Sequence, residues 1–372
     1  MKMYFLNSLS AELQTKWYDF WIRCDHAHAQ QHTLYAEIEY AKGRLPIFMY
    51  GTQDETIVCV GIFSLSSVNI LGHTIDALCL RGFAFDDLSL LPEMLERIIK
   101  YFESINVGII RISPYWYFPE ADQVINILHN AGYIPYIQNP VLMERIKGNS
   151  PDKELYTSLI DISKDDQDIL YSFKRSIRAE IKKLGKYDIT IKPIDNLHDA
   201  NIFHKFYSEM CDNRNMIKPT IKEFKTMFEN ILVKGDIGIL LGAYHNFKFL
   251  GGMWVLRNKN YTNAMRLVVC RDRITACASK NFGLTPCLHW NAIQWGKSKG
   301  CLYYDLEGDA REVKPSHPMH GIYTQKLLYN PIRKARINDH IYVCNEWINQ
   351  FHEFQKMYYI LKRKINKLHF LR

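Results

Sequence analysis

The sequence predicts an α/β protein of the α+β kind, built from two tandem units that each have a mixed sheet flanked by helices. Each half of the chain runs hairpin, helix, strand in the same order, and a linker-like stretch separates the halves. With 372 residues and 47% hydrophobic content, the chain is long enough to form two cores. The repeat period is too long for a solenoid, so the pattern indicates two copies of one unit.

The first half contains a predicted hairpin, then a helix and a strand. Residues 45–65, "LPIFMYGTQDETIVCVGIFSL", place two apolar runs around a polar turn, which we expect at Gly51-Thr52-Gln53-Asp54. In residues 86–113, two aspartates and Pro92 precede apolar positions at helical spacing, and "VGIIRIS" follows as a strand.

The second half repeats this order. Residues 237–257, "IGILLGAYHNFKFLGGMWVLR", form another hairpin pattern with its turn at His245-Asn246-Phe247. Residues 285–307 predict a helix followed by a strand. Thr285 is the expected N-cap, and Pro286 lies in the first turn, where its missing N–H costs nothing.

Residues 145–159 form the most linker-like stretch, because Gly, Asn, Ser and Pro occur in succession at its centre. The prediction is therefore a first unit at 1–150 and a second unit at 151–330. The remaining residues, 331–372, form a basic tail that we expect to be mostly helical and to pack back on the first unit.

The charge pattern favours an anionic partner without naming one. The formal net charge is +8, and two stretches, 173–186 and 356–372, are densely basic. Each is explained equally well by a solvated helix face, or by contact with phosphate-rich RNA, a nucleotide-linked precursor or an anionic membrane surface.

Several classes of protein are disfavoured. No window has the roughly 20 apolar residues of a membrane span, and the start has no signal-peptide pattern, so we expect a cytoplasmic protein. The nine cysteines are scattered and odd in number, and they predict reduced core residues. His317 and His320 lack partners for a metal site, and we expect no metal. Phosphate-loop, dinucleotide, serine-hydrolase and zinc-protease motifs are absent from the sequence.

Seven short stretches occur in the order of a known motif set. They are "QHTLYAEI" (31–38), "RGFAFDD" (81–87), "IRISP" (110–114), "FKRSIRAEIKK" (173–183), "CDNRNMIKPTIKEF" (211–224), "YDLEG" (304–308) and "GIYTQK" (321–326). In this order the chain resembles the Fem family of peptidoglycan-bridge aminoacyltransferases, whose members carry "YDFGG" and "G-x-Y-x-F-K" near the end. The resemblance implies a tandem GNAT-like fold, that of two acyl-CoA N-acyltransferase units.

The resemblance also implies a set of site residues. Asp305 and Lys326 are expected at the reaction centre, with Asp305 orienting or deprotonating the amine and Lys326 holding an anion or the charge that develops on a carbonyl oxygen. The alternatives are an aspartate that satisfies loop N–H groups and an exposed lysine on a strand edge. The expected substrate-binding residues are Arg81, Arg178, Arg214, Tyr304 and Tyr323.

Three positions depart from the motif set. Glu39 stands where precursor-using members have a lysine that helps to hold phosphates, and Lys42 lies one helical turn further on. Ser113-Pro114 replaces an Asp-Pro, and Gln325 replaces the phenylalanine before the terminal lysine. An acid repels a diphosphate, so these changes leave the acceptor open.

Three functions are compatible with the sequence. The first is an aminoacyltransferase that takes an amino acid from aminoacyl-tRNA and forms an amide on a cell-wall peptide or an envelope glycan precursor, lipid-linked or free, with peripheral contact to the inner face of an anionic membrane. The second is an acyl-CoA-dependent N-acyltransferase that acts on an amino sugar or polysaccharide precursor. The third is a catalytically degenerate binding protein. No permanently bound cofactor is expected; the co-substrate is aminoacyl-tRNA or, for the second function, acyl-CoA.

Overall fold

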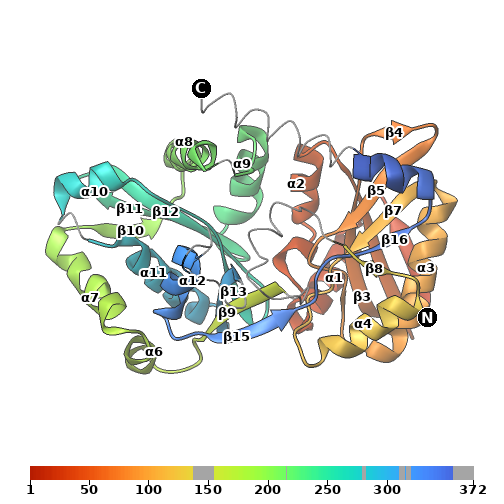
Figure 1. Cartoon of the computed structure of the whole chain (residues 1–372), viewed down its shortest axis with the longest axis horizontal. Helices are drawn as coiled ribbons and strands as arrows, with labels where there is room; N and C mark the ends of the chain where they lie inside the picture. Colours follow the sequence, from red (N-terminus) through yellow and green to blue (C-terminus); the bar gives the residue numbers. More distant parts are fainter. Residues whose placement is uncertain (137–154, 215, 279–281, 310–314, 316–319, 355–372) are drawn as a thin grey trace.

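The computed structural model describes residues 1–136, 155–214, 216–278, 282–309, 315 and 320–354, which form two α/β units side by side (Figure 1). The first sheet has the strand order β1-β2-β3-β5-β7-β16-β8, and the second has the order β10-β11-β12-β13-β14-β9-β15. The predicted fold class of two mixed sheets flanked by helices is confirmed.

The elements of the first unit are β1 (Lys2–Leu6), α1 (Ala11–Arg23), α2 (Tyr35–Ala41), β2 (Leu45–Gln53), β3 (Thr56–Leu65), β4 (Asn69–Ile70), β5 (His73–Cys79), β6 (Ala84–Phe85), α3 (Leu91–Ser104), β7 (Val107–Ile112), α4 (Ala121–Asn130) and β8 (Ile134–Pro135). Those of the second are β9 (Leu155–Asp161), α6 (Asp166–Ser172), α7 (Arg175–Lys183), β10 (Thr190–Pro193), α8 (Leu197–Asn213), α9 (Ile221–Met227), β11 (Gly238–His245), β12 (Lys248–Arg257), β13 (Tyr261–Val269), α10 (Arg271–Cys277), α11 (Leu284–Ser298), β14 (Tyr303–Asp309), α12 (His320–Leu327) and β15 (Ile332–Arg336). The last strand, β16 (His340–Val343), belongs to the first sheet.

Both predicted hairpins are present, and both turn through two residues with left-handed backbone angles. In β2 and β3 these residues are Asp54 and Glu55, with φ of 48° and 63°. The turn thus falls after the predicted position, because β2 continues through Gly51 with a bulge. In β11 and β12 the turn residues are Asn246 and Phe247, with φ of 46° and 63°. Such angles match the twist of the paired strands.

In each unit a helix connects two neighbouring strands that run parallel. Helix α3 precedes β7, which pairs in parallel with β5, and α11 precedes β14, which pairs in parallel with β13. Helix α11 begins at Leu284, with Gly283 as N-cap, so Thr285 lies inside the first turn and is not the cap. The helix extends to Gly283 because a side chain of another helix accepts the Gly283 N–H.

The segment after residue 331 differs from the expected helical tail. Strand β15 pairs with β9 in the second sheet, and β16 pairs with both β7 and β8 in the first. Only residues 337–339 lie between them. These strands satisfy backbone N–H and C=O groups at sheet positions that would otherwise be unpaired. Residues 346–354 are helical. The basic stretch 356–372 and the boundary near residue 150 lie outside the described residues.

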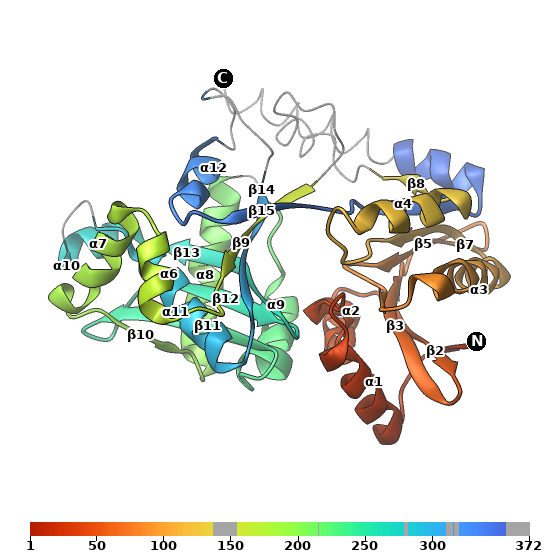
Figure 2. The same ribbon diagram turned by 90° about the horizontal axis from the view of Figure 1, so that it is seen from below.

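The two units also share one apolar core. Trp17 and Trp21 of α1 belong to the same buried cluster as Phe203 of α8 and Phe224 of α9. Helices α2 and α9 lie side by side (Figure 2). Burial of each large apolar side chain contributes about 1.5–3 kcal/mol, so this cluster stabilises the arrangement of the units. None of the described helices is long and apolar enough to cross a bilayer.

We expect Gly108→Ala to lower the free energy of unfolding by about 1–3 kcal/mol, because overpacking strains a filled core. A Cβ at Gly108 of β7 would overlap Cγ2 of the buried Ile348, which follows β16. Urea unfolding measures the change. Gly185→Ala is the control, since a Cβ there meets nothing within 4 Å. Equal stabilities of the two variants would show that the segment after β16 does not pack on β7.

Candidate functional site

The parallel strands β13 and β14 separate after three paired residues. Tyr261, Thr262 and Asn263 pair with Tyr303, Tyr304 and Asp305, and beyond Asn263 and Asp305 the strands diverge. A bulge between Asp305 and Gly308 interrupts the pairing of β14 with β9 at the same place. Buried polar side chains, among them Asn263 and Asp305, gather at this point.

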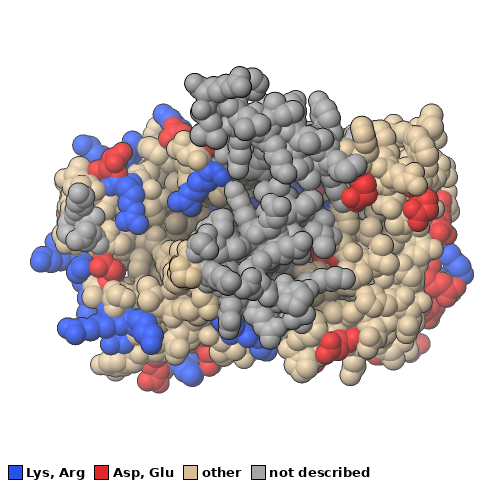
Figure 3. Space-filling model, viewed as in Figure 1, with Lys and Arg blue, Asp and Glu red and all other residues tan. Residues whose placement is uncertain are grey.

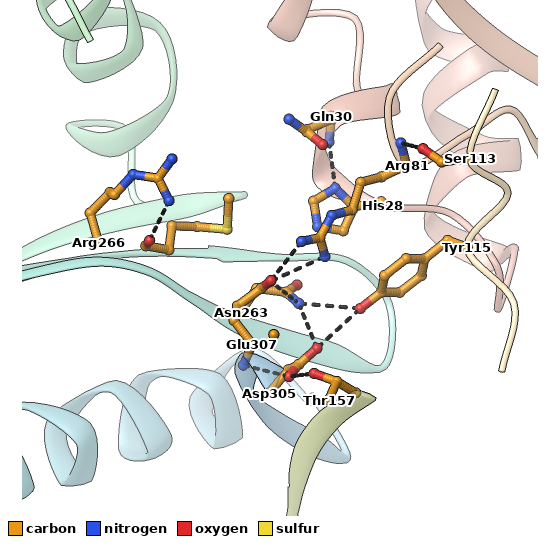
Figure 4. A network of polar contacts seen from close by, with 12 residues as sticks. His28, Gln30, Arg81, Ser113, Tyr115, Thr157, Asn263, Arg266, Asp305 and Glu307 are labelled. Carbon is orange, nitrogen blue, oxygen red and sulfur yellow. Dashed lines mark hydrogen bonds and ion pairs between the residues drawn. The ribbon is translucent and has the colours of Figure 1, made fainter. Parts of the chain in front are cut away.

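Asp305 is held at this point by both units (Figure 4). One carboxylate oxygen accepts hydrogen bonds from the Thr157 hydroxyl and, at 2.7 Å, from the Glu307 backbone N–H. The other accepts from Asn263 Nδ2 at 3.3 Å and from the Tyr115 hydroxyl at 3.4 Å. Burial, and next the negative charge of Glu307, raise the pKa of Asp305 to about 6. The protonated form of Asp305 is therefore favoured more than that of an exposed aspartate.

Glu307 forms an ion pair with Arg81 across the two units. The Arg81 guanidinium donates from NH1 to one Glu307 oxygen at 3.2 Å and from NH2 to the other at 2.6 Å. Both side chains are less than one fifth exposed. Burial alone would raise the pKa of Glu307, but the Arg81 charge outweighs it and the pKa falls to about 2. The pair is thus ionised at neutral pH.

Motif residues of the first unit hold the Arg81 backbone. Arg81 has a φ of 53°, and its N–H donates to Ser113 Oγ at 2.7 Å. Gln31 donates to the Leu80 carbonyl at 2.8 Å and packs so closely that a Cβ at Gly82 would overlap it. Three motif stretches that are distant in the sequence therefore converge on the Arg81 loop.

Lys326 lies in the last turn of α12, beside the end of β14. Its ammonium donates to the carbonyl oxygens of Glu307 at 2.6 Å and of Gly308 at 2.7 Å. The resemblance implied a lysine beside "YDLEG", and the structure places it there, on a helix and not on a strand edge. These two carbonyl contacts hold the ammonium beside the end of β14.

His28 and Tyr115 complete the group, and sequence reasoning did not select them. His28 is fully buried, with its ring centroid 5.0 Å from that of Tyr115. Its Nδ1 accepts the Gln30 N–H at 3.1 Å, and burial lowers its pKa well below the ordinary value. The neutral ring then carries its hydrogen on Nε2, which has no partner among the described residues. The only sequence signal was the aromatic run "PYWY" after the first-unit strand.

The other predicted substrate-binding residues are spread over the second unit. Arg178 donates to the carbonyls of Tyr171 and Phe173, where it caps α6. Arg214 follows α8 and is exposed. Tyr304 is fully buried, and its hydroxyl lies 2.7 Å from His289 Nδ1. Tyr323 lies on α12 under the guanidinium of Arg333, 5.1 Å away. Their substrate contacts stay predictions.

The N-terminus of α11 is already bonded to a carboxylate. Glu180 of α7 accepts the Gly283 N–H at 2.7 Å and pairs with Lys183 at 2.8 Å. A helix N-terminus attracts anions, and here an acid of the protein occupies that position.

Charge is divided between the units. Residues 1–136 contain nine Lys and Arg against fifteen Asp and Glu, whereas residues 155–336 contain 29 against 18. The formal charges are therefore −6 and +11. Figure 3 shows Lys and Arg gathered over the second unit, on the left, while Asp and Glu prevail on the first. Among the described residues, no group of three or more His, Cys, Asp and Glu side chains is arranged to hold a metal ion.

Solved structures show the same fold. The structure described as "Crystal structure of FemX" has a TM-score of 0.78 and 14% identity, covering 94% of this chain and 99% of that chain. The C-terminal domain of a putative lysylphosphatidylglycerol synthetase from Agrobacterium fabrum matches with a TM-score of 0.52 and 10% identity, over 90% and 92%. A tandem GNAT protein from the clavulanic acid biosynthesis pathway matches at 0.50 and 11%, over 92% and 99%. No family model and no curated protein matches the sequence. The expected tandem GNAT-like fold and the likeness to Fem are confirmed.

We expect Glu307→Gln to destabilise the protein by about 1–3 kcal/mol, because the hydrogen bonds of the mostly buried Arg81 lose their charged acceptor. The pKa of Glu307 is lowered from 4.5 to about 2, so its contribution is present above pH 4.5 and is lost as the pH falls through about 2. Urea unfolding between pH 2 and pH 7 should therefore show a weaker pH dependence in the variant.

Glu96→Gln is the matched control, since Glu96 pairs with Lys100 on an exposed helix face. A surface pair of this kind contributes little to stability. If Glu307→Gln were as stable as Glu96→Gln over the whole pH range, the ion pair would not hold the units together.

Proposed function

We propose that the protein is an aminoacyltransferase that moves an amino acid from aminoacyl-tRNA to an amine of a cell-wall peptide or envelope precursor. The observation that carries this proposal is the polar group where β13 and β14 separate. There Asp305 and Lys326 of the second unit meet Arg81 and Tyr115 of the first. The likeness to structures described as FemX and as a putative lysylphosphatidylglycerol synthetase supports the same class of reaction.

The proposed chemistry is aminolysis of an ester. The acceptor nitrogen attacks the ester carbonyl carbon and the bond from that carbon to the ribose oxygen breaks. The nitrogen loses its second proton as the amide forms, the ribose oxygen gains a proton, and the tRNA leaves with a free hydroxyl. An ammonium must lose a proton before it attacks. Asp305 receives this proton through the oxygen that faces Tyr115 and Asn263, whose contacts of 3.4 and 3.3 Å are the longest that Asp305 makes.

Lys326 acts on the carbonyl oxygen of the ester, whereas Asp305 acts on the attacking amine. The carbonyls of Glu307 and Gly308 hold its ammonium beside the end of β14, close to the point where the strands separate. There the positive charge attracts the oxygen that becomes negative in the tetrahedral intermediate. A pre-oriented cation stabilises such an oxygen without further reorganisation.

Two features support tRNA as the donor over coenzyme A. The formal charge of +11 on residues 155–336 suits a polyanion. The N-terminus of α11, which would receive a pyrophosphate, is bonded to Glu180. The acyl-CoA alternative remains the second candidate because a tandem GNAT structure, whose description mentions acetyl-CoA, has the same fold.

The same similarities extend the proposal to the place of the reaction. Aminoacyl-tRNA is a cytoplasmic substrate, so we place the protein in the cytoplasm. Acceptors of the envelope are assembled at the inner face of the membrane, and the basic second unit suits peripheral contact with anionic lipid there.

A transfer assay with the full chain tests the donor and Lys326 together. Labelled aminoacyl-tRNAs and labelled acetyl-CoA are supplied in parallel with extracted envelope precursors. We expect label to move from tRNA, and Lys326→Ala to lower kcat about 10²–10³-fold with little change in Tm, because the developing charge loses its cation. Lys248→Ala, at an exposed hairpin position, is the control. Label that moves only from coenzyme A, or an active Lys326→Ala protein, would contradict the proposal.

We expect Lys182→Glu with Lys186→Glu to weaken tRNA binding at least about tenfold at low salt. Both lysines are exposed on the basic stretch of the second unit, and each phosphate contact releases counterions. Filter binding at several salt concentrations measures the affinity and its salt slope. The control carries the same charge change on the first unit, Lys2→Glu with Lys100→Glu. Equal losses in both proteins would place the tRNA elsewhere.

A further inference from the structure

We propose that Glu307 is a specificity-determining residue that withholds Arg81 from phosphate, so that the first unit binds an acceptor whose bound portion carries no diphosphate. The acceptor class is then an uncharged or ammonium-bearing peptide or glycan. The inference rests on the proposed function, because it specifies which class of acceptor the proposed aminoacyltransferase uses.

The ion pair with Glu307 occupies the NH1–NH2 fork of the Arg81 guanidinium. A guanidinium fork binds a carboxylate or a phosphate through the same two parallel N–H groups. In this protein NH1 and NH2 of Arg81 both donate to Glu307, at 3.2 and 2.6 Å. Glu307 thus occupies the position that a phosphate would take.

The backbone at Glu307 indicates that the carboxylate itself is needed there. Glu307 has a φ of 65°, a left-handed conformation that glycine adopts freely and other residues adopt at a cost. Its N–H is bonded to Asp305 and its carbonyl to Lys326, so the conformation is fixed from both sides. Glycine would suit the backbone better, and only the side chain reaches Arg81 in the other unit.

Most of the remaining cations of the first unit also form ion pairs, the exposed ones with carboxylates on the same helix. Of the nine Lys and Arg in residues 1–136, all of which the structure describes, seven form ion pairs with carboxylates. They are Lys16, Lys42, Arg44, Arg81, Arg97, Lys100 and Arg111. Of the other two, Arg23 donates to the Ile57 carbonyl. Lys2 lies on β1, the edge strand of the first sheet at the end away from β16 and β8.

Lys42 shows the same arrangement at a second position. Its ammonium lies 2.6 Å from Glu39 Oε1, and the Glu39 carboxylate is buried, where it also accepts the Ser64 hydroxyl. A diphosphate entering the first unit would find paired cations and a net charge of −6. Burying an unpaired phosphate next to these acids is unfavourable. The cations near this group other than Arg81 come from the second unit: Lys326 of α12 contacts the Glu307 carbonyl, and Arg336 of β15 lies over the Tyr115 ring.

Calorimetric titration with uridine diphosphate tests the inference without any donor. We expect the unaltered protein to bind it no more tightly than about 1 mM, and Glu307→Gly to bind at least about tenfold more tightly, because Arg81 is released. Glu307→Gln should gain in the same direction, which guards against a folding defect of the glycine variant. The gain should disappear when Arg81→Ala is added, and uridine alone should show none.

Asp188→Gly is the matched control, because Asp188 is an exposed acid with a φ of 50° far from Arg81. Tight binding of uridine diphosphate by the unaltered protein, or no gain in either Glu307 variant, would overturn the inference. Since the titration needs no tRNA, failure of the transfer assay would count against the proposed function and leave this result standing.

A comparison of acceptors extends the test to turnover. One cell-wall peptide is supplied as the acceptor in two forms, free and linked to uridine diphosphate. We expect kcat/KM values within about threefold for the unaltered protein and a shift toward the linked form in Glu307→Gly. A preference of more than about tenfold for the linked form in the unaltered protein would also overturn the inference.

Discussion

The ion pair between Arg81 and Glu307 is the interaction on which the arrangement of the site depends. It joins a loop of the first unit to the end of β14 in the second, and both side chains are largely shielded from water. Around it, the Glu307 N–H bonds to Asp305 and the Glu307 carbonyl bonds to Lys326. A single residue therefore joins the first unit through its side chain and contacts the two expected catalytic groups through its backbone.

The backbone between β15 and β16 also holds the two units together. Strand β15 is an edge strand of the second sheet. After three intervening residues the chain continues as β16, which lies between β7 and β8 in the first sheet. The shared apolar core formed by α1, α8 and α9 adds a second contact between the units. Asp305, Asn263 and Thr157 are therefore positioned on paired strands. Such preorganisation is what catalysis by positioning requires.

The charges of the two units agree with the proposed binding of the donor by the second unit and of the acceptor by the first. A surplus of cations on the second unit suits a nucleic acid donor, and a surplus of acids on the first suits an acceptor that carries no phosphate there. Asp305 contacts residues of both units, and its pKa is raised to about 6 by burial and by the charge of Glu307. A carboxyl group in this range can take a proton from an amine and release it at neutral pH.

The sequence by itself determined the local elements and their duplication, because hydrophobic periodicity and turn residues act over a few positions. Both hairpins and the order of helix and strand could be predicted in this way, and the motif order placed Lys326 beside the strand that carries Asp305. Only the tertiary structure decided that Glu307 meets Arg81, since the two are 226 residues apart and no local pattern encodes that contact. The same holds for the buried His28 and Tyr115. It also holds for β15 and β16, which became strands in the place of a helical tail because unpaired sheet positions were available to them.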